Sequence, residues 1–576
     1  MERHTILDTS RRPAYRRLIL FLLLLLFPLG VFAQVQDPAA GKLSEIKNLY
    51  EGKNWDAVVN ATSGSPQSVD LLLYRGLALA HLQRREEACA TFFIGNELAP
   101  RDPRFPEELA GIAYQERDFA AAKNELRHAL AIEPHDNYAN NFLASIYFQE
   151  DNLEAALKYW NRVGKPKLDA LAFQPQPKLP PLLLDRAFAF SPGNEWNREA
   201  YLTTQARLNA LAVYPRMFFE LQAHEDDSFA LVFRGTEETS LGGNKWLEVV
   251  SLLRGLPFQT VDPEFYNLGQ AGLNWTSSYR WDDQKRRVFT ELAAPVYQNP
   301  KFRYRLYFEG HSENWNLSST FLPSTPQLAR LNLERVASGA EIRSIESGRW
   351  QWSAGAEYSF REFRSLQGIS AAATPFFTNG SSVALRSSVQ RWLIRFPEHR
   401  FTLDSTASAE IGTFFRDPLG RYGQLQGTLA ARWLPKAHRD DYETQLSLHA
   451  GQTIGDVPFD RLFTLGFDRD TPLWLRGHPG LQDGQKGNAP LGGDYLLFNS
   501  ETDKILYRNG LFTLKAGPFL DTGKTYDSSA FFGSPKWLWD TGVQTKIKVL
   551  GQFQVVLGYG KDLRSGRNSW FTTVTK

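Results

Sequence analysis

Two different hydrophobic periods divide the chain. From about residue 41 to residue 164 apolar side chains recur at helical spacing, and from about residue 243 to the end they alternate with polar ones. A helix face repeats every 3.6 residues and a strand face every second residue. The sequence therefore predicts an all-α N-terminal part and an all-β C-terminal part.

The helical region, residues 41–164, repeats itself with a 34-residue step, the tetratricopeptide period. Two repeats have a proline after their second helix, and three have small residues where two helices approach closely. The positions concerned are Gly76, Ala88, Pro100, Ala110, Ala122, Pro134, Ala144 and Ala156. The region resembles a tetratricopeptide array, whose groove usually holds a peptide or a partner helix. We expect a protein client or partner there; a spacer that binds nothing is the alternative.

A short module is expected between the two halves. Residues 165–181 are rich in Pro and Lys and predict a semi-extended linker. Residues 182–238 then predict a short strand in LLLDRAFAF, a helix in EAYLTTQARLNALAVY, and a hairpin formed by MFFELQA and SFALVFR. This order resembles a polypeptide-transport-associated (POTRA) domain. An ordinary periplasmic connector domain is the alternative.

The C-terminal half, residues 243–576, predicts a transmembrane β-barrel. In residues 302–309 and 350–360 every second side chain is apolar or aromatic. The same alternation predicts strands at Leu273–Trp281, Leu403–Thr413, Leu425–Trp433, Val543–Val549 and Phe553–Tyr559. Segments of about 10 residues with one apolar face suit a barrel that has lipid outside and water inside, and closure satisfies every backbone group. A soluble β-sandwich shows the same alternation, but so many strands in one block, rich in Trp and Tyr, favour the barrel.

Composition and the N-terminus fit an exported protein. Arg11, Arg12, Arg16 and Arg17 precede the apolar run LILFLLLLLFPLGVF, and the small residue Ala33 follows it, so residues 1–33 predict a secretory signal peptide. An uncleaved membrane anchor is the alternative. Cys89 is the only cysteine, which excludes an intrachain disulfide. The net charge of +2 gives no reason to expect a nucleic-acid partner.

No catalytic motif is found and the 10 histidines lack metal-ligand spacing, so we expect no enzyme activity, cofactor or metal.

One stretch, PLWLRGHPGLQDG, places a cation between an apolar run and a glycine-rich tail. With LGGDYLLFNSETDKILYR and LKAGPFLDTGKTY, it resembles the C-terminal part of the bacterial surface antigen family, which includes the BamA and TamA assembly factors and the two-partner secretion transporters. Leu475, Arg476 and Gly477 match an aliphatic-Arg-Gly-aromatic tetrad, and His478 stands at its aromatic position. The other matching residues are Asn499, Glu501, Phe519, Asp521 and Gly523.

The resemblance implies a 16-stranded outer-membrane barrel, with the N-terminal domains in the periplasm, that inserts or exports client proteins. It also implies that the loop carrying Arg476 folds into the barrel and that this arginine pairs with Glu501 and Asp521, since a guanidinium offers carboxylates a planar fork of donors. A passive export channel of the polysaccharide-porin type and a surface antigen or adhesin are the alternatives. Two departures from the family are His478, which could weaken the tip packing or make it sensitive to pH, and the C-terminal Lys576, where an aromatic residue is usual.

Overall fold

The computed structural model describes most of the chain after residue 37. The described residues are 38–64, 68–224, 228–237, 255–318, 327–369, 373–415, 419–436, 441–526, 532, 534, 536–549 and 553–575. The predicted signal peptide and Lys576 lie outside them, as do residues 238–254, where the predicted barrel begins. Within the described residues, no helix combines the length and the apolar character needed to cross a membrane.

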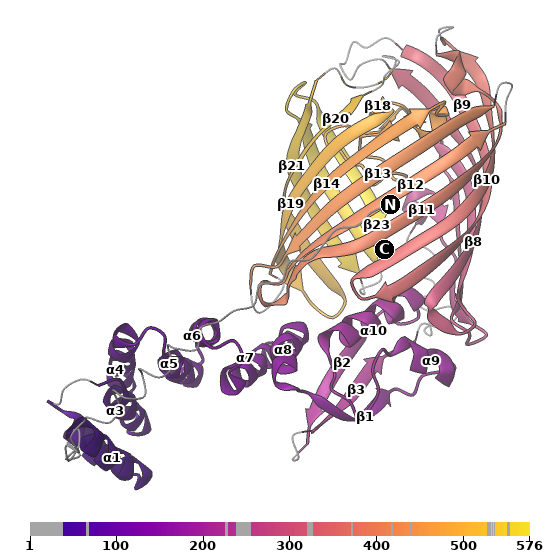
Figure 1. The fold of residues 1–576 in the computed structure, drawn as a ribbon. Coiled ribbons are helices and arrows are strands. Elements are labelled where there is room, and N and C mark those ends of the chain that lie inside the picture. The colour runs from indigo at the N-terminus through magenta and orange to yellow at the C-terminus, as the bar shows by residue number, and fades with distance from the viewer. Residues whose placement is uncertain are drawn as a thin grey trace, which may run out of the picture. The chain divides into compact units, whose positions relative to one another are not determined.

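The chain divides into two compact units, residues 1–134 and residues 135–576. Among its described residues, the first unit has six helices, which Figure 1 labels in part: α1 (Pro38–Glu51), α2 (Trp55–Thr62), α3 (Val69–His81), α4 (Arg85–Leu98), α5 (Arg104–Gln115) and α6 (Phe119–Ile132). Helices α7 (Asn137–Gln149) and α8 (Leu153–Trp160) belong to the second unit. The turns that follow α3, α5 and α7 each contain one non-glycine residue with positive φ, namely Gln83, Arg117 and Asp151. The positive-φ positions therefore recur with the same 34-residue spacing as the sequence repeat.

Close packing explains the small residues of the helical pairs. A Cβ atom on Gly76 would lie 2.2 Å from Cε1 of Phe92, so a larger residue in α3 would displace the aromatic ring of α4. The alanines at the repeat positions are fully buried: Ala88, Ala110, Ala122, Ala144 and Ala156. Pro100 and Pro134 each follow the end of a helix and are exposed. A complete tetratricopeptide solenoid stays a prediction.

The module between helices and barrel begins earlier than the sequence predicts. Residues 165–181 are not a linker, because they contain strand β1 (Lys167–Gln174), which pairs in parallel with β3 (Ser228–Gly235). Strand β2 (Met217–Ala223) pairs antiparallel with β3, so the sheet order is β1-β3-β2. The strand predicted in LLLDRAFAF is also wrong: α9 (Pro181–Ala187) starts with proline at its first turn, where proline is well tolerated.

Helix α10 (Arg198–Leu211) completes the module, and α9 and α10 cover one side of its sheet (Figure 1). The apolar core between helices and sheet includes Leu183, Leu208, Leu211 and Phe233, all nearly inaccessible to solvent. Hydrogen bonds and ion pairs join the helices to the barrel end, and three of them serve as examples. Leu211 accepts from the amide of Asn274, Thr203 accepts from the backbone N–H of Gly348, and Glu154 of α8 pairs with Arg395.

Most of the remaining strands belong to a closed barrel whose neighbouring wall strands are antiparallel. Its wall contains β4 (Thr260–Val261), β5 (Glu264–Leu268), β6 (Leu273–Trp281), β7 (Lys285–Val296), β8 (Asn299–Ser318), β9 (Gln327–Ser347), β10 (Trp350–Gln367), β11 (Gly380–Phe396), β12 (Phe401–Phe414), β13 (Gly420–Trp433), β14 (Tyr442–Gly455), β19 (Asp494–Arg508), β20 (Phe512–Tyr526), β21 (Leu538–Val549), β22 (Phe553–Asp562) and β23 (Asn568–Thr575). The predicted strands at Leu273–Trp281, Leu403–Thr413, Leu425–Trp433, Val543–Val549 and Phe553–Tyr559 all lie within these strands.

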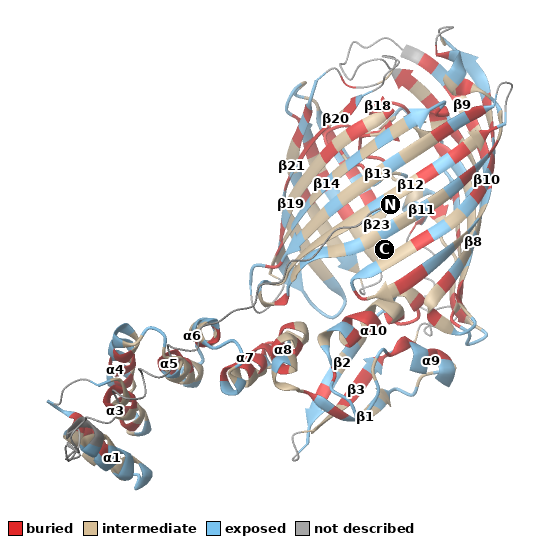
Figure 2. Cartoon of the chain, viewed as in Figure 1, coloured by how far each residue is buried: buried red, intermediate tan, exposed pale blue. Residues whose placement is uncertain are grey.

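The barrel wall is apolar outside and polar inside. Figure 2 shows buried and exposed residues alternating along the strands. Leu385, Ile411 and Val543 are 64%, 70% and 58% exposed, whereas Arg361 and Asp521 are 0% exposed. A water-soluble barrel would place these side chains the other way round, since apolar surface is costly in water. The arrangement is the one that a barrel surrounded by lipid requires.

Candidate functional site

A long segment, residues 456–493, leaves the wall between β14 and β19, which pair directly with each other. It includes the short helix η5 (Phe459–Arg461) and the two-residue strands β15 (Phe463–Thr464), β16 (Leu481–Gln482), β17 (Gln485–Lys486) and β18 (Leu491–Gly492). We call this segment the lumen loop, because its side chains contact inward-facing residues of many wall strands. Leu473 and Leu475 pack against Leu497 and Leu538 of the wall. This apolar packing fixes the backbone on either side of Trp474 and sets the direction of Arg476.

Arg476 is buried, at 2% exposure, and makes four side-chain hydrogen bonds. Its Nε and Nη2 atoms donate to the two oxygens of Asp521 at 2.8 and 2.6 Å. Its Nη1 donates to Glu501 at 2.7 Å and to Gln544 at 2.8 Å. The guanidinium carbon lies 3.9 Å from the ring centroid of Phe519, a cation–π distance. The structure thus places together the four motif residues Arg476, Glu501, Phe519 and Asp521.

The wall holds these carboxylates in place with further polar groups. Asn499 donates from Nδ2 to Asp521 and to the backbone oxygen of Trp474, both at 2.7 Å, so it ties the loop to β19. Lys546 pairs with both Glu501 and Asp503, at 2.5 and 2.7 Å. A buried charge pair is tolerated only when its remaining hydrogen bonds are satisfied. The supporting groups meet that requirement.

Glycine is needed on both sides of the loop tip. The backbone N–H of Gly477 donates to Asp540 at 2.7 Å, and a Cβ atom on Gly477 would lie 2.7 Å from Cγ of that carboxylate. From the wall side, a Cβ atom on Gly560 would lie 2.4 Å from the backbone oxygen of Arg476. Gly523 is less crowded, with a Cβ position 3.1 Å from the backbone oxygen of Leu496. The tip backbone therefore lies directly against β21 and β22.

His478 is buried at 6% exposure and faces two aspartates. Its Nδ1 atom lies 3.0 Å from Asp540 of β21, and its Nε2 atom lies 3.5 Å from Asp562 of β22. A phenylalanine at this position could fill the same space but could form neither contact. The imidazole therefore gives the tip a polar attachment to two strands.

A second attachment of the lumen loop lies at η5. Asp460 pairs with Arg335 and Arg361, at 3.2 and 3.0 Å. Arg461 pairs with Glu357 and Glu410, at 2.6 and 2.9 Å. These partners come from β9, β10 and β12. We call Asp460 and Arg461 with their partners the η5 anchor.

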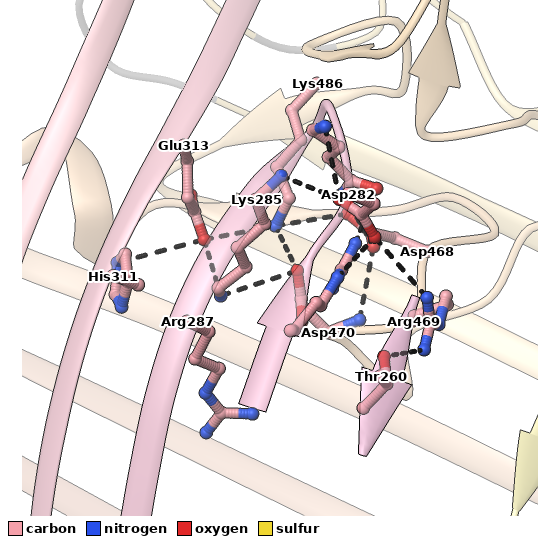
Figure 3. Close-up of polar contacts among 12 residues, drawn as sticks. Thr260, Asp282, Lys285, Arg287, His311, Glu313, Asp468, Arg469, Asp470 and Lys486 are labelled. Atoms are coloured by element: carbon pink, nitrogen blue, oxygen red, sulfur yellow. Dashed lines mark hydrogen bonds and ion pairs between the residues drawn. The ribbon is translucent and has the colours of Figure 1, made fainter. Parts of the chain in front are cut away.

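A third attachment joins the loop to β6, β7 and β8 (Figure 3). Asp470 lies 3.0 Å from Arg280, 3.5 Å from Lys285 and 2.5 Å from Lys486. Lys285 also pairs with Glu313 at 2.6 Å. Burial alone would favour the neutral Lys486 amine, but Glu313, Asp468 and Asp470 outweigh it and raise the pKa of Lys486. We call Asp468, Asp470 and Lys486 of the loop, together with their wall partners Arg280, Lys285 and Glu313, the β7 anchor.

Several of these residues were missed by the sequence interpretation. Asp540, Gln544 and Lys546 share the inward face of β21, and Glu501 and Asp503 share that of β19. Alternate polar residues in an otherwise apolar strand are the signal that could have found them. Asp460, Arg461, Asp470 and Lys486 carry no such periodic signal, because they lie in the irregular lumen loop.

Trp570 and Phe571, near the C-terminus, point to opposite faces of β23 and are 82% and 6% exposed.

No family model matches the chain, and no curated protein matches it. Several solved structures are similar in fold. BamA from Haemophilus ducreyi lacking POTRA domains 1–3 has 10% identity and a TM-score of 0.43, and the match covers 71% of this chain and 84% of that one. CdiB from Escherichia coli has 10% identity, a TM-score of 0.44, and coverage of 71% and 75%. CdiB from Acinetobacter baumannii has 12% identity, a TM-score of 0.44, and coverage of 79% and 86%.

Proposed function

We propose that this protein is a 16-stranded outer-membrane barrel that inserts or exports client proteins, with its N-terminal domains in the periplasm. The observation that carries the proposal is the lumen loop, which Arg476 fastens to β19, β20 and β21. A loop held across the interior by buried ion pairs opposes free passage of solutes. A barrel that handles clients one at a time needs such a closed resting state.

The periplasmic part would deliver the client. Strand β2 is an edge of the β1-β3-β2 sheet, and an exposed edge can take up an extended segment by strand addition. The helical repeats would bind the client or a partner protein before that step, as tetratricopeptide grooves bind peptides. The residues of the bacterial surface antigen motif lie together around Arg476, which supports this proposal over an unrelated porin.

The test is single-channel conductance of the purified full-length protein in planar bilayers. We expect low, flickering conductance for the wild type and a several-fold higher open level for Arg476→Ala. The matched control is Arg432→Ala, which removes a wall arginine that pairs with Glu443 of the neighbouring strand. This control should leave the conductance at the wild-type level.

The same conductance measurements also distinguish the two alternative functions, a passive export channel and a surface antigen or adhesin. A large, steady conductance that is the same in the wild type and in Arg476→Ala would contradict the proposal and favour the passive export channel. A closed barrel in all three proteins, with no transport defect of Arg476→Ala in cells, would favour a surface antigen or adhesin whose loops bind outside.

A further inference from the structure

We propose that His478, Asp540 and Asp562 bind one divalent transition-metal ion of the zinc class, which fastens the tip of the lumen loop to β21 and β22. One ring nitrogen and one oxygen from each carboxylate lie within 4.8 Å of one another, and all three side chains are buried. Imidazole nitrogen with carboxylate oxygens is a donor set that zinc accepts. The site is independent of the proposed transport function.

Asp540 has an oxygen that the protein leaves unsatisfied. Its Oδ2 atom accepts hydrogen bonds from the Gly477 N–H at 2.7 Å and from His478 Nδ1 at 3.0 Å. Its Oδ1 atom also lies 3.0 Å from His478 Nδ1 but accepts no hydrogen bond from the described residues, although the side chain is 0% exposed. A buried carboxylate oxygen without a donor is costly. A bound cation would remove that cost.

Asp562 and His478 are both held in fixed orientations. The backbone N–H of Arg564 donates to Oδ1 of Asp562 at 2.8 Å, and the Ser565 hydroxyl donates to Oδ2. The contact between His478 Nδ1 and Asp540 turns Nε2 toward Asp562, at 3.5 Å from its Oδ2. Supporting hydrogen bonds of this kind are what orient the ligands in metal sites.

The charge at the tip is unbalanced, unlike the charge at the β7 anchor. Asp470 of the β7 anchor has Arg280, Lys285 and Lys486 as cationic neighbours. Within the described part of the chain, neither Asp540 nor Asp562 forms an ion pair with a lysine or arginine, and His478 is the basic side chain that both contact. A protonated imidazole would balance one of the two negative charges. A divalent ion would balance both, and this difference favours the metal.

The experiment is metal titration of the full-length protein, purified in detergent, stripped with EDTA and returned to neutral buffer. We expect one Zn²⁺ per chain and a rise of several degrees in the thermal unfolding midpoint. Co²⁺ should give absorption bands of a site with nitrogen and oxygen ligands. Mg²⁺ and Ca²⁺ prefer all-oxygen sites, so at the same concentration they should have no effect.

Two variants and one control decide the assignment. His478→Phe and Asp562→Asn should each weaken Zn²⁺ binding by more than the roughly 100-fold that loss of an outer-shell partner costs. His449→Phe removes a partly buried wall histidine that contacts Thr428 and Ser447, and it should bind Zn²⁺ like the wild type. If His478→Phe does not fold, Asp562→Asn alone decides.

Wild-type protein that binds no Zn²⁺, or variants that bind as well as the wild type, would overturn the proposal. The cluster would then be a histidine held between two carboxylates without a metal, and EDTA would leave the unfolding midpoint of the wild type unchanged.

Discussion

Arg476 holds Asp521 with two parallel hydrogen bonds, from Nε and Nη2, at 2.8 and 2.6 Å. This geometry uses the planar fork of the guanidinium, while the face of the same group lies against Phe519. A lysine ammonium keeps the charge but has neither the fork nor the flat face. The position therefore requires arginine and not merely a cation.

Arg476→Lys should accordingly behave as a partial loss. Removing one member of a buried ion pair costs about 3–5 kcal/mol, and lysine, which restores the charge alone, should recover less than half of that. We expect the unfolding free energy of the barrel, measured by urea titration in lipid vesicles, to fall in the order wild type, Lys, Ala. A lysine variant equal to the wild type would show that charge is sufficient.

Gly477→Ala should displace the loop tip. The new methyl group would lie 2.7 Å from Cγ of Asp540 and 2.8 Å from the backbone nitrogen of Asp562, and both belong to the rigid wall. The conductance of the variant should rise toward that of Arg476→Ala. Gly510→Ala is the matched control, because a Cβ atom there would meet no atom within 4 Å. Equal conductance of the two alanine variants would disprove the close approach.

The lumen loop should be held by independent attachments. Lys486→Met removes a cation that lies close to Glu313, Asp468 and Asp470, so it should weaken the β7 anchor while the tip stays in place. The single variant should flicker more often, and the double variant with Arg476→Ala should open for longer than either single variant. Lys515→Met, which affects a pair with Glu443 of the wall, is the control. A double variant no different from Arg476→Ala would mean that the β7 anchor does not hold the loop.

The contact between α8 and the barrel end should depend on pH. Glu398, in the turn helix η4 (Pro397–His399), is buried against Lys158 and Tyr159 of α8. Burial opposes ionisation of Glu398, but the hydrogen bond and charge of Lys158, together with a backbone hydrogen bond and one from Tyr159, outweigh it, so the pKa of Glu398 lies below its ordinary value. A lowered carboxyl pKa stabilises the contact above the ordinary value near 4.3, and the effect is lost as the pH falls through the lowered pKa.

Glu398→Gln should therefore loosen α8 at neutral pH. We expect backbone amides of α8 to exchange hydrogen roughly tenfold faster, which corresponds to a charge-assisted hydrogen bond of about 1.5 kcal/mol. Near pH 3 or below, the difference between the variant and the wild type should shrink. A difference that stays constant with pH would show that the carboxylate charge contributes nothing.

Gly76→Ala should destabilise the helical pair formed by α3 and α4 in the N-terminal unit. The added methyl group would overlap the ring of Phe92, whose side chain is 0% exposed and has no free volume nearby. Overpacking of this kind costs about 1–3 kcal/mol. Hydrogen exchange of α3 and α4 in the full chain should accelerate, while exchange in the barrel strands should not change. Gly111→Ala in α5, where no atom lies within 4 Å of the new group, is the control.

The sequence alone determined the type of most elements. The 34-residue step predicted the helical pairs, because close helix contacts admit only small residues such as Gly76. The period of two predicted strands such as β6 and the inward or outward direction of their side chains. Local patterns failed in residues 165–190, where a proline-rich stretch became β1 and an apolar stretch became α9. Residues 167–174 form strand β1 because they pair with β3, which follows much later in the chain.

Glu501 and Asp521 could be predicted as partners of Arg476 only because the motif resembles that of a known family. Only the tertiary structure placed Gln544, Asp540 and Asp562 beside the loop tip, because strand register and barrel curvature decide which inward side chains meet. The η5 and β7 anchors depend on the path of an irregular loop through the interior. The sequence therefore determined which residues are polar and on which face they lie, and the fold determined which of them share a buried site.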